Sequence, residues 1–103
     1  MGFFKQEGNN HYKNGRLQEA SYCYQKAIVI SDYTFPEEEE GVRQIEELVQ
    51  QCHCNLAIVL VKLEKWEEVE THLNQARKGP APKIKAKALY WTVKQHIRKA
   101  QYD

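Results

Sequence analysis

The sequence has no long apolar run and no targeting signal. None of its apolar stretches approaches the roughly 20 residues that a helix needs to cross a bilayer. The N-terminus also lacks the basic stretch followed by an apolar stretch that marks a secretory signal peptide. With 103 residues, 42% of them hydrophobic and 28% charged, the chain fits one small soluble domain with a modest core. We expect a cytoplasmic location, with the nucleus as the alternative.

Cysteine is scarce and forms no recognisable framework. The three cysteines, Cys23, Cys52 and Cys54, are an odd number without a disulfide spacing, which is typical of reduced thiols in a reducing compartment. Cys52, His53 and Cys54 suggest a metal-binding triplet. However, three consecutive residues of a helix point about 100° apart and cannot meet at one ion. We expect no metal site.

The motifs of catalysis are missing as well. The sequence contains no Ser or Cys beside a local base, no carboxylate pair held in a motif and no Gly-rich phosphate loop. The four histidines are scattered over different predicted helices, where we expect each to pack or to face solvent: His11, His53, His72 and His96. We therefore expect a binding protein without a cofactor rather than an enzyme.

Acidic residues are absent from residues 78–102. No Asp or Glu occurs between Lys78 and Tyr102, whereas these basic residues do: Lys78, Lys83, Lys85, Lys87, Lys94, Arg98 and Lys99. An acidic run, Glu37–Glu40, balances them, so the net charge is only +1. The asymmetry indicates either an anionic partner near the C-terminal helix or a solvated basic face. The near-neutral total charge and the lack of a nucleic-acid motif argue against nucleic acid, although Tyr90 and Trp91 stand among the lysines.

Helical periodicity is what the sequence does contain, and it predicts an all-α chain. We expect five helices, over residues 2–13, 17–31, 37–63, 66–77 and 83–100. Apolar residues recur at three- and four-residue spacing along the third helix and mark one buried face: Ile45, Leu48, Val49, Cys52, Leu56, Val59 and Leu60. We expect Thr34 to cap this helix and Pro36 to lie in its first turn.

The first two predicted helices suit a tightly packed hairpin, since small residues alternate with large ones and Asn14-Gly15 suits the turn. The spacing resembles the tetratricopeptide repeat, a helix-turn-helix unit of about 34 residues. The residues that carry the resemblance are Phe4, Gly8, Tyr12, Gly15, Leu17, Ala20, Tyr24 and Ala27. A second copy follows, with Asn55-Leu56-Ala57, Leu63-Glu64-Lys65-Trp66, Leu73 and Ala76, and a third begins at Lys87-Ala88-Leu89-Tyr90.

About fifteen extra residues separate the first two copies. This resembles the C-terminal repeat domains of FKBP-type immunophilins and of aryl-hydrocarbon-receptor-interacting proteins. The resemblance implies one domain, residues 1–103, built as a short solenoid of two and a half repeats. Its parts are repeat one (about 2–33), an extended linker and helix (about 34–49), repeat two (about 50–80) and the first helix of repeat three (about 83–101).

The third copy lacks its second helix, and Ala100–Asp103 resembles the turn that would lead into it. The fifth helix is then expected to expose an apolar side: Leu89, Tyr90, Val93 and Ile97. Such a stripe indicates self-association or helix swapping. The alternative is a piece of a longer immunophilin-like protein whose prolyl isomerase domain precedes Met1.

The resemblance also implies a partner. Chaperone-binding tetratricopeptide domains grip the C-terminal aspartate of heat-shock proteins 70 and 90, which end in Glu-Glu-Val-Asp, with a two-carboxylate clamp. The residues of this sequence that match the clamp are Lys5, Asn9, Asn55 and Lys87. By resemblance, the lysines neutralise carboxylates, and the amides hydrogen-bond to the terminal carboxylate and the peptide backbone. This predicts a co-chaperone adaptor.

One position departs from the clamp. One turn beyond Lys87 the family has Arg, whereas this chain has Trp91, whose indole offers a single N–H and no charge. Lys83 or Lys94 is a candidate to supply the missing charge. Trp91 itself either walls the groove for an apolar peptide side chain, fills it, or packs structurally, and Tyr12 is a further candidate contact. The alternative function is a scaffold or self-associating domain that does not recognise a carboxylate.

Overall fold

The computed structural model describes residues 2–102 of the chain and contains five α-helices in that range. They are α1 (Phe3–Lys13), α2 (Leu17–Asp32), α3 (Glu39–Lys62), α4 (Trp66–Lys78) and α5 (Pro82–Tyr102). Every helix begins and ends within two residues of its predicted bounds, so the all-α class is confirmed. The predicted terminal turn is wrong, because α5 continues through Tyr102. Met1 and Asp103, the ends of the expected domain, lie outside the described residues.

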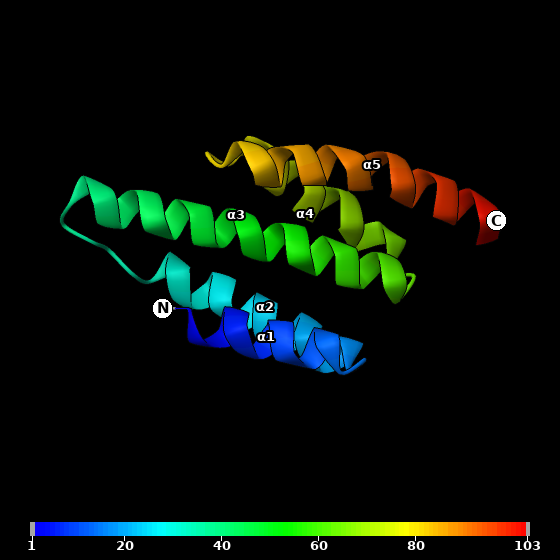
Figure 1. Cartoon of the computed structure of the whole chain (residues 1–103), viewed down its shortest axis with the longest axis horizontal. Helices are drawn as coiled ribbons and strands as arrows, with labels where there is room; N and C mark the ends of the chain where they lie inside the picture. Colours follow the sequence, from blue (N-terminus) through cyan, green and yellow to red (C-terminus); the bar gives the residue numbers. More distant parts are fainter. Residues whose placement is uncertain (1, 103) are drawn as a thin grey trace.

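The helices form an elongated stack of antiparallel neighbours. Figure 1 shows α1, α3 and α5 running in one direction and α2 and α4 running back between them. Each helix packs on the next in the chain, and α3 also packs on α5. The described chain measures 48 × 25 × 20 Å. This arrangement is compatible with stacked helical hairpins. Within residues 2–102, no helix has the length and apolarity that spanning a membrane requires.

The first hairpin is close because α1 presents a residue without a side chain. A Cβ placed on the buried Gly8 would lie only 2.7 Å from Cε1 of Tyr24 on α2. The aromatic ring therefore occupies the space that any other residue would need for its own side chain. The turn follows at Gly15, whose φ of +75° is a conformation that glycine adopts at little cost.

Helix α3 is the centre of the core. Its segment from Leu56 to Val61 is buried on every side, because α2 packs on one flank and α4 and α5 on the other. The prediction of a single buried face is therefore wrong for this half of the helix. The first half fits it better, since Ile45, Leu48 and Val49 are only half-buried there. Such all-round burial makes α3 the element on which the other helices depend.

The start of α3 differs from the sequence prediction. The helix begins at Glu39, two residues later than expected, and Glu38 precedes it in an extended conformation. The hydroxyl of Thr34 instead donates to the carbonyl of Ile30 at 2.9 Å, so Thr34 ends α2 and does not cap α3. Pro36 lies outside the first turn, and its ring contacts Gly41, where a Cβ would lie 2.8 Å from the proline Cβ.

A buried glutamine of α3 holds the turn between α4 and α5. The Nε2 of Gln50 donates to the carbonyl oxygens of Ala76 and Ala81, at 2.8 and 3.1 Å. Its Oε1 accepts from the backbone N–H of Ala81 at 2.7 Å. Gly79 allows this approach, because a Cβ there would overlap the glutamine side chain. One side chain thus satisfies three backbone groups and fixes where α5 begins.

We expect Gln50→Met to lower the free energy of unfolding by about 1–3 kcal/mol, because it leaves three backbone groups of the α4–α5 turn without their partner. Urea denaturation followed by circular dichroism measures the change. Gln44→Met is the matched control, because Gln44 is exposed on the same helix. Equal unfolding midpoints for the two variants would contradict this role of Gln50.

The side chains of the suspected metal-binding triplet, Cys52, His53 and Cys54, point in different directions, as consecutive positions of a helix require. Cys52 and Cys54 are buried, whereas His53 turns to α4 and stacks on His72. The two Nδ1 atoms lie 2.9 Å apart, so one ring donates and the other accepts. Burial, followed by the neighbouring ring, lowers the pKa of His53 from 6.5 to about 4, and burial also lowers the pKa of His72. Asp32 and Glu68 oppose these shifts.

This histidine pair predicts loss of stability in mild acid. The unfolded chain takes up a proton on His53 near pH 6.5, whereas the folded chain resists it until about pH 4. The contribution is therefore complete above pH 6.5 and is lost as the pH falls towards 4. Between pH 7.5 and 5.5, we expect the melting temperature of the unmodified chain to fall more than that of His53→Gln. The reason is that ~1 pH unit of this interval lies below 6.5, where the unfolded chain takes up the proton on His53 and the folded chain does not. His96→Gln, on the exposed side of α5, should retain the original slope, and identical slopes for all three proteins would refute the assignment.

Candidate functional site

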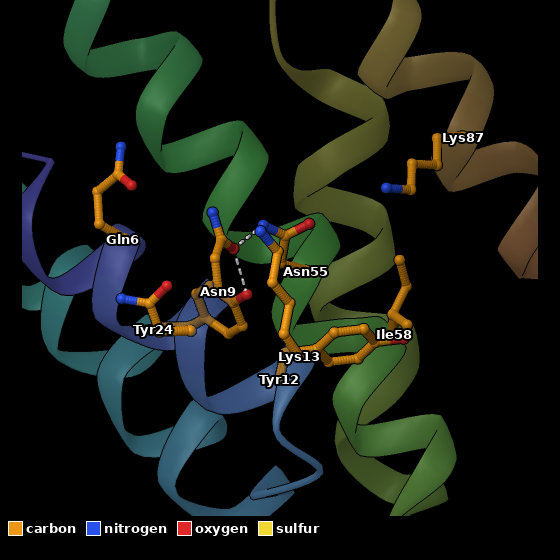
Figure 2. A pocket seen from close by; sticks show the side chains of 9 residues that line it. Gln6, Asn9, Tyr12, Lys13, Tyr24, Asn55, Ile58 and Lys87 are labelled. Carbon is orange, nitrogen blue, oxygen red and sulfur yellow. Dashed lines mark hydrogen bonds between the residues drawn. The ribbon is translucent and has the colours of Figure 1, made fainter.

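A pocket of about 290 Å³ opens between α1, α3 and α5. Figure 2 shows its walls, with α1 on one side, α3 behind and α5 opposite. It is lined by Gln6, Asn9, Asn10, Tyr12, Lys13, Tyr24, Asn55, Ile58 and Lys87. Three of the four predicted clamp residues, Asn9, Asn55 and Lys87, therefore meet at one place, together with the candidate contact Tyr12.

The centre of the pocket is a hydrogen-bonded triad from three helices (Figure 2). The hydroxyl of Tyr24 donates to Oδ1 of Asn9 at 2.5 Å, and Nδ2 of Asn55 lies 3.5 Å from the same oxygen. Burial raises the pKa of Tyr24 to about 12, so the phenol remains a donor at neutral pH. Oδ1 of Asn9 accepts from both neighbours. The Nδ2 group of Asn9 is therefore left to donate into the pocket.

The hydrogen bonds also fix the register of α1 against α3. Lys5 on α1 donates to Oε1 of Gln51 on α3 at 2.7 Å, and Asn9, four residues on, meets Asn55, also four residues on. Both pairs are 46 residues apart in sequence, which requires the two helices to run parallel and in step. The polar residues of α1 and α3 thus form two facing stripes.

Two lysines flank the triad, and the sequence predicted one of them. Lys87 comes from α5, where the neighbouring Ala88 is fully buried in the core. The other is Lys13, which lies one turn beyond Asn9 on α1 and also lines the pocket. The spacing of Lys5, Asn9 and Lys13 by four residues was a signal for it, since all three lie on one face of the helix.

The predicted clamp residue Lys5 is not part of this pocket. Its ammonium group is held by Gln51, and together with Lys83 it lines a separate hollow of about 510 Å³ on the same α1–α3–α5 side. Lys83 therefore lies beside Lys5 and not beside Asn9.

Trp91 and Lys94 also lie away from the pocket. Trp91 is half-buried and packs against the core, and its ring contacts Nζ of Lys94 at 4.9 Å. Lys94 lines a different hollow on the outer side of α5. Tyr12 does line the pocket, with Nζ of Lys62 lying 5.0 Å from its ring centre.

The lining is rich in hydrogen-bond donors. It contains two lysines and four side-chain amides (Gln6, Asn9, Asn10, Asn55), and none of the lining residues is acidic. Such a set favours an anionic ligand that accepts several hydrogen bonds, and a carboxylate is the simplest. A metal is a poor fit: between residues 2 and 102 there is no group of three His, Cys, Asp or Glu side chains close enough to hold one.

The described residues form an all-helical fold with a pocket lined by lysines and side-chain amides. A comparison with curated proteins finds similarity to the peptidyl-prolyl cis-trans isomerase FKBP42 of Arabidopsis thaliana, 33% identical over 72 residues. The match covers 68% of this chain and 20% of that protein, so the chain spans about a fifth of the length of this relative. No protein-family model matches the chain, and no solved structure matches it. The similarity agrees with the resemblance to immunophilins.

Removal of the Tyr24 hydroxyl should loosen the triad. We expect Tyr24→Phe to lower the free energy of unfolding by about 0.5–1.5 kcal/mol, because the buried hydrogen bond to Asn9 is lost while the ring still packs on Gly8. Chemical denaturation measures the change, with Tyr22→Phe on the exposed side of α2 as control. A loss no larger than that of the control would mean that the hydroxyl does not hold Asn9.

Proposed function

We propose that this chain is a tetratricopeptide-type protein-interaction domain that docks the acidic C-terminal tail of heat-shock protein 90 or 70. The observation that carries the proposal is the convergence of Asn9, Asn55 and two lysines in a pocket whose lining contains no carboxylate. The similarity to FKBP42 supports it, because the resemblance to immunophilins led to these residues. The chain then acts as a co-chaperone-type adaptor in the cytoplasm and not as an enzyme.

The geometry suggests how a terminal carboxylate is held. The amide group of Asn9, oriented by Tyr24, donates to one oxygen, and Asn55 supplies a second amide within reach. Lys13 and Lys87 approach from opposite walls and neutralise the terminal carboxylate and the aspartate side chain. A charge-assisted hydrogen bond of this kind contributes about 1.5–3 kcal/mol. An acidic side chain further up the peptide reaches Lys5 and Lys83 in the neighbouring hollow, where Glu47 offsets part of their positive charge.

Lys13 takes the place of the arginine that this clamp otherwise has. Trp91 packs against the core and brings no charge to the pocket, whereas Lys13 brings one from α1. The replacement is incomplete, because lysine is a point charge on a flexible stem and does not form the two parallel hydrogen bonds of arginine. We therefore expect binding that is specific for a free carboxylate but of only micromolar strength.

A titration with the pentapeptide Met-Glu-Glu-Val-Asp, beside the same peptide amidated at its C-terminus, tests the proposal. Calorimetry is the primary measurement, and tryptophan fluorescence is the check. We expect micromolar binding that is lost on amidation, because the terminal aspartate then loses one of the two carboxylates that the lysines neutralise. Binding of neither peptide, or of both equally, would contradict a carboxylate clamp and would favour the scaffold that recognises another protein, or its own copy, without a free carboxylate.

Variants assign the residues. We expect Asn9→Ala and Lys87→Glu to abolish binding without unfolding the chain, and Lys13→Gln to weaken it about ten- to a hundredfold. Lys65→Gln, at the start of α4 and outside the pocket, is the control. If Lys5→Gln abolished peptide binding and Lys13→Gln left it unchanged, Lys5 would be the clamp residue, as the family resemblance implies.

A further inference from the structure

An apolar strip with basic edges covers the outer side of α5. Leu89, Tyr90, Val93 and Ile97 are each 53–62% exposed, and they recur along the helix so that they share one side. A hollow of about 650 Å³ runs along this side, bordered by Lys94 and Arg98. We call this surface the basic face.

A second exposed apolar surface lies at the junction of α2 and α3. Tyr33 and Phe35, in the connection between the helices, are 79% and 83% exposed, and Val29 and Val42 flank them on the two helices. The acidic run Glu37–Glu40 follows directly in the chain and is exposed throughout. We call this surface the acidic corner.

The two surfaces lie apart on the molecule. In Figure 1 the α2–α3 connection is at one end of the long axis, whereas α5 extends to the C-terminus at the other end. One chain therefore cannot cover its own basic face with its own acidic corner. Exposed apolar patches with charged borders mark interaction sites in soluble proteins.

We propose that copies of this chain associate head to tail, with the acidic corner of one copy seated on the basic face of the next. The contact is complementary in two respects. The rings of Tyr33 and Phe35 are exposed, and the hollow beside Val93 and Ile97, with a volume of about 650 Å³, has room for aromatic side chains. The carboxylates of the corner then meet Lys94 and Arg98 at the border of the hollow.

Charge also selects this pairing over the symmetric one. Two basic faces brought together would oppose Lys94 and Arg98 to their own copies, and two acidic corners would oppose four consecutive glutamates to four others. The contact is therefore heterologous, which leaves one free surface of each kind on every dimer. Neither surface includes a residue that lines the carboxylate pocket, so this inference stands independently of the proposed function.

Complementation between two disabled variants tests the proposal. Ile97→Glu disrupts the basic face, and the double substitution Tyr33→Ser, Phe35→Ser disrupts the acidic corner. All three side chains are exposed, so the variants should fold, and circular dichroism checks this. By light scattering, we expect the unmodified chain to gain mass with concentration above its 12.1 kDa and each variant alone to stay at 12.1 kDa. An equimolar mixture of the two variants should form a complex of twice that mass, since one intact junction remains.

Four outcomes would overturn the proposal. The first is an unmodified chain that stays monomeric at millimolar concentration. The second is a mixture of the two variants that does not assemble, because a symmetric contact cannot be rescued in this way. The third is loss of association in the control Tyr22→Ser, an exposed position on α2 outside both surfaces. Added salt should weaken the association at least tenfold if the glutamates and Lys94 contribute, and insensitivity to salt would also speak against the pairing.

Discussion

The packing of Tyr24 against Gly8 is the contact on which the pocket depends. Because Gly8 has no side chain, the ring of Tyr24 lies directly on α1, and its hydroxyl reaches Asn9 one residue further on. That hydrogen bond fixes the carboxamide of Asn9 with its donors turned to the groove, and Asn55 of α3 shares the same acceptor oxygen. The close contact between Gly8 and Tyr24 in the first hairpin thus determines how Asn9 is oriented towards Asn55 of α3. Any larger residue at Gly8 would displace the ring and the amide with it.

The opposite wall of the pocket depends on α3 in another way. Gln50 binds the turn before α5, and Ala88 is buried beside Lys87, so the position of this lysine follows from the core and not from the surface. Further along, the guanidinium of Arg77 on α4 donates to Thr92 at 2.6 Å and holds the middle of α5. Both walls are therefore built from buried contacts, and the groove between them is preformed. A preformed donor set loses little conformational freedom when a ligand binds.

The helices could be predicted closely because their periodicity and breakers are local properties: Gly15 and Gly79-Pro80 interrupt patterns that are otherwise continuous. The family resemblance also pointed to Asn9, Asn55 and Lys87, and the structure places these three residues around one pocket. The sequence could not predict that Lys13, and not Lys5, lines this pocket. Both lysines lie one turn from Asn9, and only the tertiary contact with Gln51 distinguishes Lys5. The same holds for Thr34, whose hydroxyl is equally able to end α2 or begin α3 until the path of the connection is known.

Helix α5 serves two surfaces because its sides are chemically distinct. Lys87 lines the pocket and Ala88 is buried in the core, whereas Leu89, Val93 and Ile97 are exposed. Trp91, half-buried between them, packs its apolar ring against the core. In the proposed head-to-tail assembly the pockets stay open, since the junction uses the outer side of α5. Successive copies then present several of the proposed carboxylate sites on one particle, and linked weak sites hold a multivalent partner far more tightly than one site does.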